Sequence, residues 1–181
     1  MRTLCSLMML LCLPMVIVAQ DAPKEPVEQP WLTEIKNARI PMRDGKNLAA
    51  NVLLPKERGK YPCVLVQTPY NKDRMGREYG DNTSEVGRGS EKAFSLFDRQ
   101  NYAYVFVDWR GFYGSKDAAV PRGTRGWRRG QDGYDCVEWC AKQDWCDGKV
   151  GTWGGSALGK QQFDTAAEQP PHLVCAAPLI A

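Results

Sequence analysis

Apolar residues occur along this chain in short runs, and segments with helical spacing separate them. Strands are predicted for residues 61–70, 102–111 and 173–178, where the apolar run is continuous, and for the shorter segment 149–153. A continuous run, in place of strict alternation, is typical of a strand buried on both faces of a parallel sheet. The runs therefore predict a sheet with elements packed on both sides.

Helical segments are predicted between these strands. Residues 90–100 and 132–143 gather apolar side chains on one face, and residues 156–169 form a third segment, which two prolines end. Before the first strand, two extended runs flank Asp44-Gly45, a dipeptide typical of tight hairpins. A hairpin followed by alternating strands and helices predicts an α/β fold, a mostly parallel sheet with an antiparallel lead-in hairpin.

The first residues of the chain differ in kind from the rest. Arg2 is followed by an apolar stretch that Pro14 interrupts, and Ala19 precedes a polar segment. This is the layout of a secretory signal peptide, and the apolar stretch is short for a membrane span. We expect residues 1–20 to be a signal peptide cleaved near Ala19, with a retained anchor as the alternative. The mature protein is then secreted or periplasmic, without membrane attachment.

The remaining chain is expected to hold one domain. Residues 21–31 are polar and rich in proline, which favours a disordered leader, and residues 32–181 suffice for a single core. The 181 residues include 24 basic and 21 acidic side chains, a net charge of only +3. A nucleic-acid partner is not expected at this charge.

Cysteine chemistry offers a weaker line of interpretation. Of the seven cysteines, two lie in the signal peptide, and the odd number left implies at least one unpaired thiol. Cys63 and Cys175 lie in predicted strands and are expected to be buried thiols. Cys136 and Cys140 share a helix face, but no nearby histidine supports a metal site. A Cys140–Cys146 bridge across the helix end remains open.

The segment VGTWGGSALG, residues 150–159, joins a predicted strand to a predicted helix through a glycine-rich turn. Small residues flank Ser156, as a sharp strand-to-helix turn that exposes a nucleophile requires. The spacing G-x-S-x-G is not met, because Leu158 stands two residues after the serine and Gly159 follows one later. The turn predicts a nucleophilic Ser156, and the alternative is a structural serine that caps the helix.

Five segments extend this prediction to the rest of the chain: MRDGKNLAANVLLP, YPCVLVQTPYNK, YAYVFVDWRGFYGS, GQDGYDCVEWCAKQDWCDGKVGTWGGSALG and QPPHLVCAAP. Together they resemble, in order from about Ile40 onwards, the amino-terminal part of one α/β-hydrolase family. That family holds X-prolyl dipeptidyl-peptidases, cocaine-esterase-like acyl hydrolases, α-amino-acid ester hydrolases and glutaryl cephalosporin acylases. Its serine motif is G-x-S-Tyr-x-G, which Gly159 matches.

The resemblance implies a role for each of several residues. Ser156 is the implied nucleophile, and the backbone N–H of Ala157 and the hydroxyl of Tyr70, in a Pro-Tyr motif, are the implied oxyanion donors. Ala157 stands where the family has tyrosine, a change that keeps the N–H but alters the pocket wall. Asp108 and Arg110, in DWRG, also match a family motif, and we interpret them as an ion pair or loop anchor.

A catalytic serine needs a base, and the chain has one histidine, His172. In α/β-hydrolases the acid and the histidine follow the serine in the chain. The predicted helix after Ser156 carries the chain about 16 Å away from the turn, so we expect His172 at the opposite edge of the sheet. Asp164 and Glu168 lie on or near the same helix. We therefore expect residues 32–181 to be part of a longer hydrolase, inactive by themselves.

The leading hypothesis is a secreted serine hydrolase that needs no cofactor or metal. Its partners are small acyl esters, amides or peptides, X-prolyl peptides included, and the sequence specifies neither the acyl group nor the oligomeric state. A degenerate hydrolase module that only binds a partner is the alternative. A redox or metal protein that uses Cys136, Cys140 and Cys146 is a third.

Overall fold

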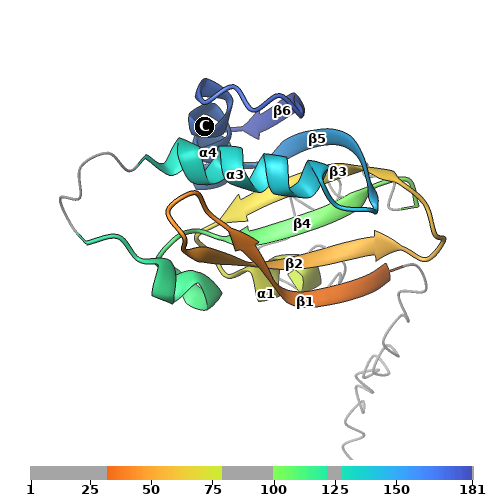
Figure 1. The fold of residues 1–181 in the computed structure, drawn as a ribbon, viewed down its shortest axis with the longest axis horizontal. Helices are drawn as coiled ribbons and strands as arrows, with labels where there is room; N and C mark the ends of the chain where they lie inside the picture. Colours follow the sequence, from red (N-terminus) through yellow and green to blue (C-terminus); the bar gives the residue numbers. More distant parts are fainter. Residues whose placement is uncertain (1–31, 79–99, 122–127, 181) are drawn as a thin grey trace, which may run out of the picture.

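A computed structural model describes residues 32–78, 100–121 and 128–180 of the chain. Within them, six strands form one sheet in the order β1-β2-β4-β3-β5-β6 (Figure 1). The strands are β1 (Leu32–Pro41), β2 (Asn47–Pro55), β3 (Tyr61–Thr68), β4 (Ala103–Asp108), β5 (Cys146–Gly155) and β6 (Leu173–Leu179). The pairs β1–β2 and β2–β4 are antiparallel and the other three pairs are parallel. The predicted α/β fold, with its antiparallel lead-in hairpin, is confirmed.

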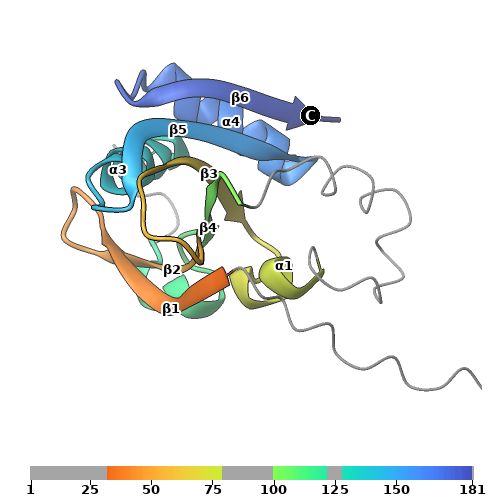
Figure 2. The ribbon, with the colours of Figure 1, turned by 90° about the vertical axis from the view of Figure 1, so that its right-hand side faces the viewer.

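The helical elements lie on both faces of this sheet. They are α1 (Lys72–Glu78), the 3₁₀ helix η2 (Tyr113–Ala118), α3 (Arg129–Ala141) and α4 (Ala157–Ala167). Helices α3 and α4 pack against each other, and α1 lies on the opposite side of the sheet from α3 (Figures 1 and 2). A Cβ at Gly133 of α3 would overlap Thr165 of α4, so glycine permits the close approach of these helices.

Strand β3 shows how the continuous apolar runs are used. Cys63 and Leu65 belong to a core that includes buried residues of α3, whereas Val64 and Val66 belong to a second core with Met75 of α1. Successive residues of a strand point to opposite faces, so both sets are buried only where both faces are covered. The prediction of a strand buried on both faces is confirmed here.

Strand β6 departs from that prediction. It is the last strand in the order of the sheet, and Val174 is 59% exposed, with Cys175 exposed beside it. The expectation that Cys175 is buried is therefore wrong, because β6 is the outermost strand (Figure 2) and its residues are exposed on both faces among the described residues. Cys63 is buried as expected, and Cys140 and Cys146 are separate free thiols without a bridge.

Two helical elements were not predicted, and three predictions lie outside the described residues. Helix α1 and η2 occur where polar, glycine-containing composition predicts loops. The predicted helix at 90–100, apart from its last residue, the signal peptide at 1–20 and the leader at 21–31 are outside the described ranges. In the described part of the chain, no helix is long and apolar enough to cross a membrane.

Candidate active site

Ser156 and Tyr70 follow neighbouring parallel strands at the same edge of the sheet. Leu65 of β3 pairs with Thr152 of β5, and equal numbers of residues separate this pair from the strand ends at Thr68 and Gly155. Ser156 comes directly after β5, and Tyr70 comes two residues after β3. The carboxyl ends of parallel strands are where open α/β sheets place their active sites.

The backbone of Ser156 has a conformation that non-glycine residues rarely adopt. Its φ is 53° and its ψ is −121°, and its side chain is exposed. Such strained residues cluster at functional sites and persist only where the surrounding structure holds them. The Ser156 side chain makes no capping hydrogen bond to α4, so the helix-cap alternative finds no support in the structure.

Close packing and hydrogen bonds hold this strained turn, which we call the elbow (residues 154–157). The Ser156 N–H donates to the Leu179 carbonyl of β6 at 2.9 Å, and the Ser156 carbonyl accepts from the Lys160 N–H at 3.0 Å. Gly154 has a φ of 139°, and a Cβ there would lie 2.5 Å from the Leu158 Cβ. Glycine is therefore required at position 154, two residues before the serine, both by its backbone angle and by the lack of space.

The two predicted oxyanion donors lie at this edge of the sheet. Ala157 begins α4, and N–H groups in the first turn of a helix have no partner within the helix. The Tyr70 side chain is 50% exposed, and its N–H donates to the Thr68 hydroxyl at 2.9 Å. No hydrogen bond joins the Tyr70 hydroxyl to Ser156 among the described residues, although both residues lie at the same edge of the sheet.

Asp108 anchors the loop that carries Tyr70. The Lys72 N–H donates to one Asp108 carboxylate oxygen at 2.8 Å, and the Gly114 N–H donates to the other at 3.0 Å. Burial raises the pKa of Asp108, although these two N–H donors act in the opposite direction. Asp108 therefore holds two loops together from the end of β4, in agreement with its expected role as a loop anchor.

Arg110 anchors a different set of elements. Its guanidinium pairs with Asp132 of α3 and with Asp44 of the β1–β2 turn, each at 2.7 Å. The hydrogen bonds that Arg110 donates to Asp132 raise the pKa of Arg110, so the guanidinium stays charged. The expected structural role of Arg110 is confirmed, but its partners are these two aspartates and not Asp108.

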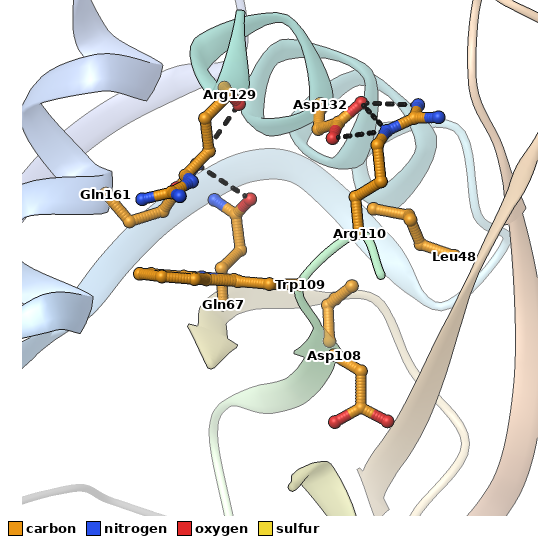
Figure 3. Close-up of a pocket in the computed structure, with 9 residues that line it drawn as sticks. Leu48, Gln67, Asp108, Trp109, Arg110, Arg129, Asp132 and Gln161 are labelled. Atoms are coloured by element: carbon orange, nitrogen blue, oxygen red, sulfur yellow. Dashed lines mark hydrogen bonds and ion pairs between the residues drawn. The ribbon is translucent and has the colours of Figure 1, made fainter. Parts of the chain in front are cut away.

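A small cavity lies beside this anchor and not beside Ser156. It has a volume of about 20 Å³, and Asp108, Trp109, Arg110, Arg129 and Gln161 contribute to its lining (Figure 3). A space of this size holds about one water molecule. It is therefore too small for a substrate, and it is separate from the elbow.

His172 lies at the opposite edge of the sheet from Ser156. It directly precedes β6, and its carbonyl accepts from the Val150 N–H near the start of the parallel part of β5. Its ring Nδ1 lies 2.9 Å from a Glu138 carboxylate oxygen of α3. The structure agrees with the expectation that His172 is not the base, because β5 separates it from the elbow.

The acidic residues that follow Ser156 in the chain also lie apart from the elbow. Asp164 is exposed on α4, and Glu168 pairs with Arg128 at 3.1 Å. The described residues thus bring together a strained serine, a helix N-terminus and a tyrosine, but not a proton-transfer pair.

Sequence reasoning missed the polar side chains that support these loops. Lys72 is 1% exposed, and its ammonium donates to Asn37 and to Asp73, while Gln162 of α4 is 2% exposed. Buried lysine and glutamine are rare, but nothing in a helical pattern marks such a residue as buried. The position of Lys72 two residues after the Pro-Tyr motif is the one signal that singles it out.

Comparisons with known proteins agree on one family. The model of the family described as X-Pro dipeptidyl-peptidase (S15 family) matches residues 44–181. Cocaine esterase from Rhodococcus sp. (strain MB1 Bresler) is 33% identical over 145 residues, which cover 80% of this chain and 23% of that protein. The chain thus spans about a quarter of the length of this relative.

Solved structures give the same result. An α-amino acid ester hydrolase is 27% identical, with a TM-score of 0.67 over 93% of this chain and 29% of that one. A CocE/NonD family hydrolase from Staphylococcus aureus is 28% identical, with a TM-score of 0.62 over 80% of this chain and 27% of that one. The similarity includes the sheet edge at which Tyr70 and Ser156 lie, since the family match runs through both.

Proposed function

Because this chain belongs to the X-Pro dipeptidyl-peptidase (S15) family of hydrolases, we propose that it is part of a serine hydrolase with Ser156 as its nucleophile. The substrate is an acyl ester, an amide or an X-prolyl peptide, and the reaction passes through an acyl-enzyme. The observation that carries the proposal is the Ser156 backbone, with φ 53° and ψ −121°, directly between a buried strand and a helix N-terminus.

The chemistry follows from this position. The Ser156 Oγ attacks the substrate carbonyl carbon and loses its proton to a base, and the leaving group departs with a proton as the acyl-enzyme forms. Water then attacks the acyl-enzyme, releases the acid and restores the serine. The negative charge that develops on the carbonyl oxygen is stabilised by the Ala157 N–H and the Tyr70 hydroxyl, which lie at the same edge as Ser156.

We place the acid and the histidine of the catalytic triad outside residues 1–181. The reason is the position of the chain's one histidine, which lies at the far edge of the sheet and pairs with Glu138. Residues 1–20 are proposed to be a secretory signal peptide, which supports a secreted or periplasmic enzyme.

The test is covalent labelling of the product of the complete gene. A fluorophosphonate probe should modify Ser156, identified by mass spectrometry of the peptides, and Ser156→Ala should abolish both labelling and ester hydrolysis. His172→Ala is the matched control and should retain labelling. Labelling of a different serine in Ser156→Ala would overturn the nucleophile, and loss of labelling in His172→Ala would overturn the location of the base. A protein that is folded but takes up no label would support the binding module instead.

A further inference from the structure

A buried amide lies behind the elbow. Gln162 is on α4, the helix that begins directly after Ser156, and its side chain is 2% exposed. Its Nε2 donates to the Gly154 carbonyl at 2.9 Å and, more weakly, to the Ala177 carbonyl of β6 at 3.4 Å. Its Oε1 accepts from the Thr152 hydroxyl of β5 at 3.2 Å. The one side chain thus connects α4 with β5 and with β6.

These contacts span the strained residue. Ser156 itself is held by two backbone hydrogen bonds, to Leu179 and from Lys160. Neither of them fixes the end of β5 relative to α4, which are the two elements that the elbow joins. The bond from Gln162 to the Gly154 carbonyl does so, because it joins the residue where the chain enters the turn to the second turn of the helix that leaves it. The Gln162 side chain therefore links the two ends of the segment from Gly154 to Gln162, which contains Ser156.

The energetics favour a specific role for this amide. Burying an amide without partners is unfavourable, so hydrogen bonds at both ends stabilise a buried glutamine. Both ends of the Gln162 amide are hydrogen-bonded to β5, the strand that leads into the elbow. Strained backbone of the Ser156 kind persists only where neighbouring contacts over-determine it.

We propose that Gln162 is a positioning residue for Ser156. Its amide fixes the end of β5 against α4, and thereby holds the Ser156 Oγ and the Ala157 N–H in their relative places. The proposal rests on the proposed function, in which Ser156 is the nucleophile. A misplacement of about 1 Å in a reacting group can lower a rate by about 10²-fold.

The adjacent residue provides a matched control. Gln161 is 1% exposed on the same helix, and its Nε2 donates to Gln67 and to Thr165 at 3.2 and 3.3 Å. Neither partner belongs to the elbow, and Gln67 and Gln161 both line the cavity of Figure 3. Gln161→Leu and Gln162→Leu therefore each remove a buried amide from neighbouring positions, and only the Gln162 amide bonds to the elbow. Among the described residues the Gln161 Oε1 has no hydrogen-bond partner, whereas both ends of Gln162 are bonded.

The experiment compares the two variants in the full-length protein. We expect Gln162→Leu to lower the urea midpoint more than Gln161→Leu, because only Gln162 is bonded at both ends. Gln162→Leu alone should lower the rate of fluorophosphonate labelling and kcat about 10-fold or more, with KM little changed. Thr152→Val, which removes the donor to Oε1, should slow labelling in the same direction by a smaller factor. It serves as the second variant if Gln162→Leu does not fold.

The outcomes separate this inference from the proposed function. If Ser156→Ala still labels, the nucleophile is wrong and Gln162 has nothing to position. If Ser156→Ala abolishes labelling while Gln162→Leu labels at the rate of Gln161→Leu, the positioning role is overturned. Should Gln162→Leu fail to fold, wild-type labelling in Thr152→Val has the same consequence.

Discussion

The two loops at the active edge of the sheet are held in different ways. The loop after β3 (residues 69–71), which carries Tyr70, is anchored through charges: Asp108 accepts the Lys72 N–H, and the Lys72 ammonium donates to Asp73 at 2.7 Å. The elbow is anchored through neutral groups, which are the Gln162 amide, the Thr152 hydroxyl and backbone hydrogen bonds.

This difference matches what each loop has to do. The elbow keeps one residue in a strained conformation, which requires close packing on both sides of it, as at Gly154 and Leu158. The β3 loop has only to hold an exposed tyrosine at a fixed place, and hydrogen bonds to charged groups are strong enough for that. We therefore expect the elbow to respond to changes of volume and the β3 loop to changes of charge.

The largest effect is expected where the elbow has no space. Gly154→Ala should cost roughly 1–3 kcal/mol in backbone strain and about 1–3 kcal/mol more because the new Cβ overlaps Leu158. Gly45→Ala is the control, since Gly45 also has a positive φ, 79°, but has no atom near the added Cβ. Urea unfolding should show a loss for Gly154→Ala well beyond that for Gly45→Ala. Equal losses would contradict the role of packing at the elbow.

The second effect concerns chemistry at the β3 loop. Tyr70→Phe removes the proposed oxyanion donor, and losing one such donor lowers kcat by about 10²–10³-fold. The Tyr70 side chain is 50% exposed, so the thermal stability should not change. Steady-state hydrolysis of an acyl ester by the full-length enzyme, together with a melting curve, checks both statements. A wild-type kcat would remove Tyr70 from the mechanism.

The third effect tests whether the charge of Asp108 anchors the β3 loop. Asp108→Asn keeps the size of the side chain but turns one of two acceptor oxygens into a donor that faces an N–H group, and hydrogen bonds to charged groups contribute about 1.5–3 kcal/mol. We expect a lower urea midpoint and slower acylation, because the Lys72 end of the Tyr70 loop is released. Thr68→Val, which removes the hydroxyl that accepts the Tyr70 N–H, is a neutral comparison in the same loop. A midpoint for Asp108→Asn equal to that of the wild type would show that charge does not anchor the loop.

The local part of the fold was predictable from the sequence, and the non-local part was not. Asp44-Gly45 specifies the hairpin and continuous apolar runs specify the parallel strands, because both depend on neighbouring residues. The insertion of β4 between β2 and β3 depends on pairing across the chain, which no local pattern encodes. Cys175 was predicted wrongly for the same reason: its run is apolar, but its burial depends on what covers β6.

The candidate site, like the fold, has a part that could be predicted from the sequence and a part that could not. The elbow at Ser156 could be predicted because small residues around a serine are visible in the sequence, and the remoteness of His172 followed from the length of one helix. The supports could not be predicted. Gln161 and Gln162 look alike in the sequence, and only the packing of α4 directs one toward Gln67 and the other toward Gly154.

The smallest expected effect is a pH dependence of stability, which a charge change near the β3 loop should show and an uncharged change near the elbow should not. The hydrogen bond from Lys72 lowers the pKa of Asp73 below its ordinary 3.8, with smaller contributions in the same direction from Asn51 and Lys36 and an opposing one from burial. A carboxylate with a lowered pKa stabilises the fold above the ordinary value, and this contribution disappears as the pH falls through the lowered one. Asp73→Asn should therefore lie below the wild type in urea midpoint near pH 7, and the difference should shrink at about pH 3. Thr152→Val, an uncharged change in the hydrogen bonds that support the elbow, should differ from the wild type equally at both pH values. A pH-independent difference for Asp73→Asn would show that the charge of Asp73 does not support the β3 loop.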